Sequence, residues 1–390
     1  MPGIYNLEGV IKHYDWGGQT FIPSLLQVEN KEGKPFAEYW MGTHPLGIGI
    51  IKTTTNEEMP LTAVIGDLPY LFKAQDVKQM LSVQVHPSKQ AAAIEFAREN
   101  AAGVLLTAPH RNYKDDNHKP EMLVALGDFW LLHGFKPADQ LVYTLLNVVE
   151  LRELLEVFNQ SGYGGLYKHV MEMPQEEVNR VLQPLIDNIS KNYSLDSPDK
   201  NDEDFWAFRA AQTFTRNGNL DRGIFSIYLF NIVHLKKGEG LFQDAGVPHA
   251  YLEGNCVEIM ANSDNVLRGG LTTKHIDVAE LMKHVKCEAT VPNILHPQAI
   301  NSDEKKYITP VNDFQLNVIE LEPNQVASFS TTLAEIVLLS EGAVELSSGE
   351  TIVELKPGNV SAVALPMSTV QVKGLRKATV YRASTAINNR

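Results

Sequence analysis

The sequence predicts a mainly β protein with a helical insertion, chiefly because the spacing of its apolar residues changes twice. Short strand-like segments broken by glycine, proline and asparagine fill roughly the first 135 residues. A helical spacing covers residues 136–222, and strand-like segments then continue to the C-terminus. Residues 237–249 and 356–367 both contain an apolar strand, a glycine turn, a second strand and a proline stop. This faint repeat predicts two related β-barrels.

The composition is typical of a globular protein and excludes several classes of function. The 390 residues include 34 Lys and Arg against 47 Asp and Glu, a net charge of −13. This charge argues against nucleic acid or an anionic membrane as the main partner. A chain of this length also predicts two or three structural units.

The two cysteines and the N-terminus predict a soluble protein of the cytoplasm. Cys256 and Cys287 belong to no CxxC pair and cannot form a disulfide framework or a thiolate metal cluster. The first residues lack a charged start followed by an apolar run, which a signal peptide requires. The apolar stretch 225–233 is much shorter than the ~20 residues that span a bilayer.

In the first region, alternation predicts a strand over 80–87 that ends at a proline. Helix-forming residues over 89–98 follow Ser88, which is a suitable N-cap. Two apolar runs, 122–126 and 129–132, predict buried strands around the Gly-Asp turn between them.

Helices are expected next. A first apolar face comprises Leu141, Leu145, Val148, Val149, Leu155 and Phe158. Pro174 opens a second helix, with two glutamates in its first turn and an apolar stripe over 178–189. The acidic stretch 196–204 is interpreted as a solvated linker and the start of a third helix. After Asn217-Gly218, the apolar run 224–233 predicts a strand, and 278–284 predicts a short helix.

Three separate clusters carry candidate metal ligands. Gln84 and His86 leave the same face of a strand, although a histidine there is often structural. Glu121 begins an apolar strand after the polar segment 113–120, which could equally be a charged surface loop. His249 stands between a proline and a tyrosine, as a ligand or as a core histidine.

Together these clusters offer two imidazoles, one carboxylate and one amide oxygen. A set of nitrogen and oxygen ligands without sulfur suits Zn²⁺, Mn²⁺ or Fe²⁺, and leaves room for a substrate oxygen. Four cations accompany the candidate ligands, namely Lys89, Lys119, Arg268 and Lys274. In an acidic protein this concentration favours a pocket for an anionic substrate.

Two long motifs resemble those of the type I phosphomannose isomerases. The first is Tyr113-x-Asp-x-Asn-His-Lys-Pro-Glu121, and the second runs from His249-Ala-Tyr-Leu through Glu258 and Asp264-Asn-x-Leu-Arg268 to Lys274. The segments 82–87 and 36–45 also resemble that family, and the similarity extends over nearly the whole chain.

The resemblance implies two cupin-type jelly-roll β-barrels plus an α-helical domain. The metal-bearing region would comprise residues 1–135 and 223–300, the helical domain 136–222, and a second jelly roll without metal 301–390. This agrees with the repeat, in which the second copy has Met367 where the first has a histidine. Within the segment 36–45, Glu38 and His44 could support the site or serve packing alone.

The resemblance also implies the ligands and the substrate. One Zn²⁺ per chain would be held by Gln84, His86, Glu121 and His249. A phosphorylated hexose would contact Ser82, Lys89, Glu258, Asp264 and Lys274. One departure is visible, because Gly269 and Thr273 replace the alanine and proline that the family usually has, which loosens the loop before Lys274.

The implied reaction interconverts mannose 6-phosphate and fructose 6-phosphate through a cis-enediol(ate). A base must move a proton between C2 and C1, and Lys119 is the preferred candidate if a neighbouring metal ion keeps its amine neutral. His118, Glu258 and Asp264 are rivals for that role or for ring opening. The resemblance places Arg268 and Lys274 near the substrate phosphate, and Arg268 has a second possible role in stabilising the enediolate.

Two other functions compete with this interpretation. An iron-dependent oxygenase could use the same type of barrel, although a glutamine ligand and a basic surround fit a sugar phosphate better. A sugar-phosphate-binding module without turnover is the other alternative, and such a module would ordinarily have lost a ligand. For the isomerase we expect a monomer.

Overall fold

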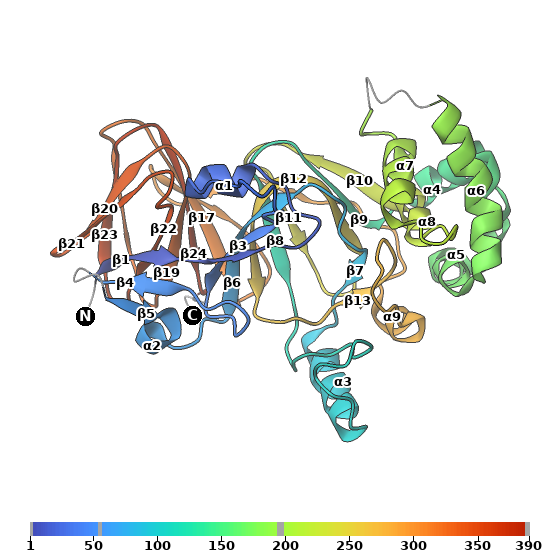
Figure 1. The fold of residues 1–390 in the computed structure, drawn as a ribbon, viewed down its shortest axis with the longest axis horizontal. Coiled ribbons are helices and arrows are strands. Elements are labelled where there is room, and N and C mark those ends of the chain that lie inside the picture. Colours follow the sequence, from blue (N-terminus) through green and yellow to red (C-terminus); the bar gives the residue numbers. More distant parts are fainter. Residues whose placement is uncertain (1–2, 54–56, 193–198, 387–390) are drawn as a thin grey trace.

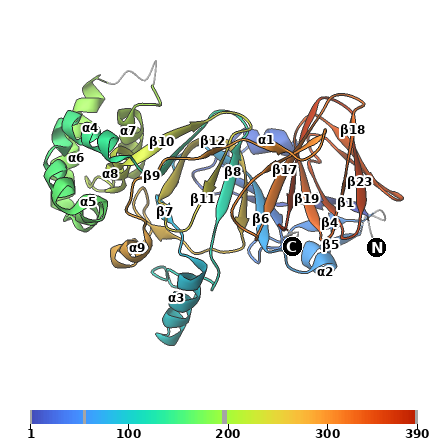
Figure 2. The same ribbon diagram turned by 180° about the vertical axis from the view of Figure 1, so that it is seen from behind.

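A computed structural model describes residues 3–53, 57–192 and 199–386. Antiparallel sheets form most of the molecule, and a group of helices covers one end of it (Figures 1 and 2). Large antiparallel sheets with a helical segment between them in sequence confirm the coarse prediction. Of the acidic stretch 196–204, residues 196–198 lie outside the described residues.

An 11-stranded sheet holds the middle of the molecule. Its main path runs β14 (Ile294–Leu295), β11 (Gly240–Gln243), β8 (Glu121–Ala125), β12 (His249–Ala261), β6 (Tyr70–Val77), β3 (Glu38–Gly42) and β2 (Val10–Lys12). Four strands pair off this path: β7 (Gln84–Val85), β9 (Phe129–Phe135), β10 (Phe230–Leu235) and β13 (Leu267–Arg268).

Strand β12 organises this sheet because it changes partners along its length. Its second half pairs with β6 and β8, whereas its first half pairs with β9 and β7. The register shifts between Tyr251 and Glu253, where a bulge lets the strand bend from one set of partners to the other. The start of β12, at His249, is therefore surrounded by strands from three parts of the sequence.

A second sheet, of nine strands, joins the two ends of the chain. Its order is β15 (Gln298–Ala299), β16 (Glu304–Tyr307), β17 (Gln315–Leu321), β24 (Ala378–Ser384), β19 (Glu335–Glu341), β22 (Ser361–Ala364), β1 (Ile4–Glu8), β4 (Ile50–Lys52) and β5 (Glu58–Pro60). A four-stranded sheet packs beside it, with β18 (Val326–Ser330), β23 (Thr369–Gly374), β20 (Val344–Ser348) and β21 (Thr351–Leu355). The first 135 residues thus contribute strands to both large sheets.

Most helices lie between β9 and β10 in sequence. They are α4 (Ala138–Asn147), the short 3-10 helix Val149–Leu151, α5 (Glu153–Glu172), α6 (Gln175–Asn192), α7 (Glu203–Phe214) and α8 (Gly223–Leu229). Elsewhere lie α1 (Phe21–Leu26), α2 (Leu61–Ile65), α3 (Lys89–Ala101) and α9 (Val278–His284). None of the helices described is long and apolar enough to cross a membrane.

Several predicted elements are confirmed. Ser88 caps α3 by accepting a hydrogen bond from the amide of Ala91. The stripe predicted for α6 is buried, with Val178 and Leu182 at 0% exposure. Helix α9 begins and ends at the predicted residues. Strands β8 and β9 fall on the two predicted apolar runs.

Three local predictions are wrong. The run 224–233 is not one strand, because residues up to Leu229 form α8 and only then does β10 begin. All seven residues of α8 are buried, so the run is apolar on every side and its spacing cannot distinguish helix from strand. Strands β8 and β9 do not form a hairpin, since each pairs with β12 instead.

The strand predicted over 80–87 shrinks to the two residues of β7. The backbone just before β7 makes hydrogen bonds to two different segments. The amide of Leu81 donates to the carbonyl of Tyr251, and the amide of Val83 donates to the carbonyl of Gly270. No single neighbouring strand can therefore form a regular ladder with this segment.

Candidate metal centre

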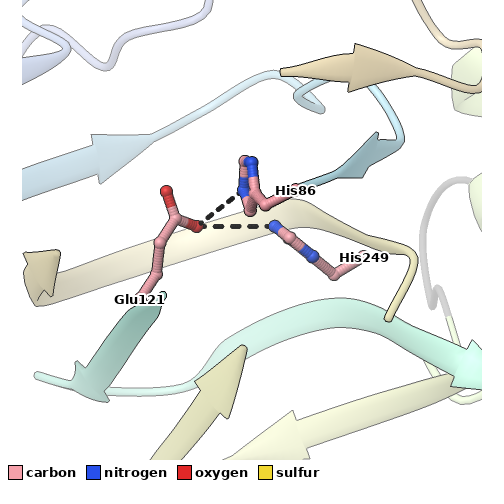
Figure 3. Close-up of side chains that lie close together, drawn as sticks. All are labelled: His86, Glu121 and His249. Carbon is pink, nitrogen blue, oxygen red and sulfur yellow. Dashed lines mark ion pairs between the residues drawn. The ribbon is translucent and has the colours of Figure 1, made fainter. Parts of the chain in front are cut away.

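Three side chains from distant parts of the sequence meet at the beginning of β12. Glu121 begins β8, His86 follows β7, and His249 begins β12. Glu121 Oε2 lies 3.5 Å from His86 Nε2 and 3.4 Å from His249 Nε2. Figure 3 shows the carboxylate directed at the facing nitrogens of both imidazoles. One ion between them would have three ligands within reach.

Backbone carbonyls fix the orientation of both imidazoles. His86 Nδ1 donates to the carbonyl of Asn265 at 2.9 Å, and His249 Nδ1 donates to the carbonyl of Val247 at 3.0 Å. Because a carbonyl can only accept, the proton sits on Nδ1 and the Nε2 lone pair of each ring faces the centre. His86 Nε2 is buried and has no hydrogen-bond partner among the described residues. This orphaned nitrogen fits a metal ligand.

Electrostatics keep the three groups in the forms that a metal requires. Burial lowers the pKa of His86 to about 4, so this imidazole is neutral at pH 7. Burial alone would raise the pKa of the Glu121 carboxyl, but Lys119 and the imidazoles outweigh it and hold that pKa well below its usual range. A neutral imidazole and an ionised carboxylate are ready donors.

Gln84 lies beside the triad through strand pairing. It stands opposite His249 on β12 and opposite Arg268 on β13. Directly opposed residues share one face of a sheet, so these three side chains form a row. Gln84, Glu121 and His249 line one cavity of about 70 Å³, together with Glu38, Lys73, Gln75, Leu81, Lys119, Tyr251 and Glu258.

Beside the triad in this cavity is a buried charge network that includes Lys73, which the sequence analysis missed. Lys73 Nζ lies 2.8 Å from Glu258 and 3.6 Å from Glu38. Burial opposes the charge of Lys73, but the two carboxylates outweigh it and raise the pKa of Lys73. Gln75 Nε2 donates to both Glu38 and Glu258. The sequence did contain a signal for this network, because a lysine and a glutamine stand two residues apart in the apolar run that forms β6.

Glu258 is saturated with donors. It accepts from Lys73 at 2.8 Å, from Gln75 at 2.7 Å and from the Tyr251 hydroxyl at 2.7 Å. Burial, and after it the charge of Glu258, raises the pKa of Tyr251 well above its usual value, so the phenol stays a donor. The predicted substrate residue Glu258 thus lines the cavity with a carboxyl group that three donors hold in place; burial raises its pKa, and the charge of Lys73 opposes the rise.

Lys119 lies at the edge of the triad. Its Nζ is 2.8 Å from Glu121 Oε1, and it lines the cavity. His118 points elsewhere, since its Nε2 lies 3.0 Å from Asp313. Asp264 Oδ2 lies 3.5 Å from His44 Nε2, which connects His44 to a predicted substrate residue. His44 therefore contacts a residue of the predicted site, whereas Glu38 is connected to Glu258 only through Lys73 and Gln75.

Asn265 ties the loop before β8 to His86. It is fully buried, and its amide group accepts from the amide of Lys114 at 2.7 Å and donates to the carbonyls of Asp115 and Asn117, each at 2.8 Å. Its own carbonyl holds His86. The two motifs of the sequence analysis therefore meet in space through this one side chain.

The predicted cations differ in their surroundings. Burial lowers the pKa of Arg268, and burial followed by the charge of Arg268 lowers the pKa of Lys274, so these two cations lie near each other. Across the described ranges neither has a carboxylate within 4.0 Å. Lys89 is exposed at the first position of α3, and Ser82 is partly buried just before β7. A partly buried arginine beside an exposed lysine, with no carboxylate partner among the described residues, is suited to bind an anion.

Two buried polar residues lie beside the ligands on neighbouring strands. His133 on β9 stands opposite His249, and Gln243 on β11 stands opposite Glu121. Neither side chain has a hydrogen-bond partner among the described residues. Burial lowers the pKa of His133 to about 3, so it is neutral. Neither was predicted from the sequence, because a single histidine or glutamine in an apolar strand gives no signal.

The chain is similar to known proteins along nearly its whole length. Residues 4–138 match the model of the phosphomannose isomerase type I catalytic domain. The mannose-6-phosphate isomerases of Shigella flexneri and Escherichia coli (strain K12) are each 36% identical over 393 residues, covering 95% of this chain and 97% of the relative. A crystal structure of mannose 6-phosphate isomerase from Salmonella typhimurium, bound to fructose 6-phosphate and zinc, is 32% identical with a TM-score of 0.87. The match covers 98% of this chain and 100% of that one.

Proposed function

The chain belongs to the type I phosphomannose isomerase family, and from this we propose that its buried centre at the start of β12 interconverts mannose 6-phosphate and fructose 6-phosphate. The observation that carries the proposal is the triad of His86, Glu121 and His249, with both Nε2 atoms facing one carboxylate oxygen. Zinc is the cofactor, as in the solved relatives that hold it.

The ligand set we propose is Gln84 with the triad. Gln84 shares the cavity and stands beside His249 in the strand register, which supports its inclusion. When bound there, zinc would polarise the oxygens on the reacting carbons without changing its oxidation state. Asn265 and Val247 hold the two imidazoles in the required tautomer through their carbonyls.

We assign the proton transfer between C2 and C1 to Lys119. Its amine lines the cavity beside Glu121, whereas the rival His118 is engaged with Asp313 and Glu258 already accepts three hydrogen bonds. Arg268 stands in register with Gln84, where its planar fork can stabilise the developing cis-enediol(ate).

The substrate phosphate, in this proposal, is bound on the side of Arg268 and Lys274. Both cations lack a carboxylate partner within the described residues, which supports an anion as their ligand. Ser82, Lys89 and Asp264 complete the proposed substrate contacts. Of these, Asp264 has the clearest support, because it pairs with His44 near the cavity.

The finer architecture is also a proposal. We infer two cupin-type jelly rolls, one with metal from residues 1–135 and 223–300 and one without metal from 301–390, with a helical domain over 136–222. The pairing of β12 with strands on both its sides supports the first barrel, and the pairing of β1 with β22 adds an N-terminal strand to the second. We further propose a monomer that works in the cytoplasm, which light scattering and cell fractionation would test.

The test is a turnover assay on the purified chain with mannose 6-phosphate as substrate. Activity should disappear after chelation and return when Zn²⁺ is added, while Mn²⁺ and Fe²⁺ are added singly for comparison. A chain that binds the sugar phosphate but converts none of it with any of these metals would contradict the proposal.

A further inference from the structure

One partly buried carboxylate of the helical segment, that of Asp221, holds the loop that follows Arg268. Asp221 precedes α8, and its Oδ1 accepts hydrogen bonds from the amides of Leu271 and Gly223, each at 2.7 Å. Its Oδ2 accepts a third from the amide of Thr272 at 3.2 Å. Two successive amides of a loop far away in sequence are thus bound by one side chain.

The loop needs such an anchor because its backbone is unfavourable on its own. Leu271 has φ of 53°, in the left-handed region that a leucine side chain disfavours. The anchoring bond from its amide to Asp221 offsets this cost. Without the carboxylate, the backbone of Leu271 would relax toward an ordinary conformation and move its neighbours.

Close packing brings the same two segments together. Gly270 and Gly223 lie so near that a Cβ on either one would overlap the backbone of the other segment. A Cβ on Gly269 would overlap the hydroxyl of Tyr167, which comes from α5. The absence of side chains at these glycines lets the helical segment seat the loop against β7, where Gly269 N donates to the carbonyl of Val83 at 2.9 Å.

This loop begins at one functional cation and ends at the other. Arg268 immediately precedes Gly269, and Lys274 follows Thr272 by two residues, with its amide bonded to the Thr272 hydroxyl at 3.1 Å. The charge of Arg268 lowers the pKa of Lys274, after burial, so the two side chains are held near each other. Fixing Leu271 and Thr272 therefore fixes the spacing of the two cations.

We propose that Asp221 is a positioning residue that sets the geometry of Arg268 and Lys274 for the substrate phosphate. It does not touch the substrate, and it acts through the amides of Leu271 and Thr272. The proposal rests on the assignment of Arg268 and Lys274 to the phosphate. It gives the helical segment a role in the reaction, because that segment supplies the anchor.

The experiment compares Asp221→Ala and Asp221→Asn with wild type. For Asp221→Ala we expect KM for mannose 6-phosphate to rise about tenfold or more while kcat changes less, because the binding cations lose their fixed spacing. For Asp221→Asn we expect a KM between those of wild type and Asp221→Ala. Its remaining oxygen can accept from the amide of Leu271, whereas its NH₂ group faces the amide of Thr272. Zinc content should stay at one per chain in all three.

Asp204→Asn is the matched control. Asp204 lies in α7 of the same segment, and burial raises its pKa as burial raises that of Asp221. It accepts from the Tyr228 hydroxyl in α8 at 2.7 Å and does not bond the loop. A purely structural effect would lower thermal stability in both variants and leave KM unchanged in both.

Hydrogen exchange gives a readout that does not depend on activity. The amides of Leu271 and Thr272 should exchange faster in Asp221→Ala and stay protected in Asp204→Asn. Faster exchange together with an unchanged KM would overturn the positioning role, and so would unchanged exchange. A wild-type chain without turnover would instead overturn the proposed function itself.

A second pair of variants keeps the test decisive if Asp221→Ala folds poorly. Gly269→Ala places a Cβ against the Tyr167 hydroxyl, so it should raise KM in the same way. Adding Tyr167→Phe removes that hydroxyl and should restore part of the wild-type KM. A double variant no better than Gly269→Ala alone would contradict the idea that the helical segment sets the position of this loop.

Discussion

One arginine in each of the two large sheets has opposite surroundings. In the nine-stranded sheet, Arg382 lies 2.9 Å from Glu304 and 3.3 Å from Glu335, and Asn317 donates to Glu304 at 2.6 Å. The charges of this cluster are paired within it, although Glu335 Oε2 and Arg382 Nε make no hydrogen bond to a described residue. In the 11-stranded sheet, Arg268 has no carboxylate partner in the described part of the chain. Of these two arginines, the one without a carboxylate partner among the described residues is therefore the one that lies where we place the reaction.

The two copies of the internal repeat also differ at matched positions, in the residue that follows the proline. Pro248 is followed by His249, which is 3% exposed and faces Glu121. Pro366 is followed by Met367, which is 77% exposed with φ of 59°. Two similar strand–turn–strand segments thus end in a buried ligand and in a solvent-exposed side chain. The two sheet ends therefore differ in the identity and in the burial of one residue, and only the buried histidine can serve as a ligand.

Glu121→Gln should produce the largest difference between the sheets. A neutral amide removes the charge that the two imidazoles and zinc share, so zinc content should fall and kcat/KM should drop by about 10³-fold or more. The matched variant in the other sheet is Glu304→Gln, for which we expect reduced stability with normal turnover per folded molecule. Equal loss of activity in Glu121→Gln and Glu304→Gln would contradict our placing the reaction in the 11-stranded sheet.

The two arginines should separate activity from stability. Arg268→Ala should lower kcat/KM by about 10²-fold with little change in the melting temperature, because this cation serves the substrate. Arg382→Met leaves the carboxylates of Glu304 and Glu335 buried without their cation, and should lower the free energy of unfolding by about 3 kcal/mol with kcat/KM unchanged. Kinetics and urea denaturation of both variants measure this. A loss of stability without loss of activity in Arg268→Ala, together with the reverse in Arg382→Met, would contradict these assignments.

Glu335 should make the nine-stranded sheet sensitive to pH. Burial raises the pKa of Glu335 to about 7, with Arg382 opposing the rise. Its folded pKa lies above the unfolded value, so the folded state binds more protons between about pH 4.5 and pH 7. Stability should therefore fall as pH rises through this range, by about 3 kcal/mol at most from this group.

The measurement is urea denaturation of wild type and Glu335→Gln at pH 5 and pH 8. The variant keeps a neutral side chain at both values, so it should lose less stability between them than wild type does. An identical pH dependence in both proteins would contradict a raised pKa at Glu335.

Met367→His should have the smallest effect. It restores the histidine of the first repeat, but the side chain is exposed and, within the described ranges, no group of metal-ligating side chains includes this position. We expect zinc content to stay at one per chain and activity to be unchanged. A second bound zinc would show that the identity of this one residue, and not its burial, separates the two sheets.

The sequence predicts those elements whose periodicity is unambiguous. The stripe of α6, the cap of α3 and the bounds of α9 follow from local rules of spacing and capping. By contrast, α8 is apolar on all sides, and a fully buried run has no period to interpret. The joining of β1 to β22 depends on pairing across more than 350 residues, which no local pattern records.

The candidate site was predictable where motifs concentrate chemistry. His86, Glu121 and His249 stand in polar or proline-bounded segments that differ from their surroundings. Lys73 and Asp221 were missed because each is a single charged residue whose partner is supplied by a distant strand or loop. Their roles arise only from the tertiary contacts that offset the cost of burying them.

The central claim is that one metal centre, at the start of β12, serves the whole chain. Anomalous diffraction at the zinc edge, on crystals of the zinc-loaded protein, tests it most directly. We predict one peak, between Glu121 Oε2 and the Nε2 atoms of His86 and His249, and none in the nine-stranded sheet. A fully active protein with no peak at this triad, or with its peak elsewhere, would contradict the account.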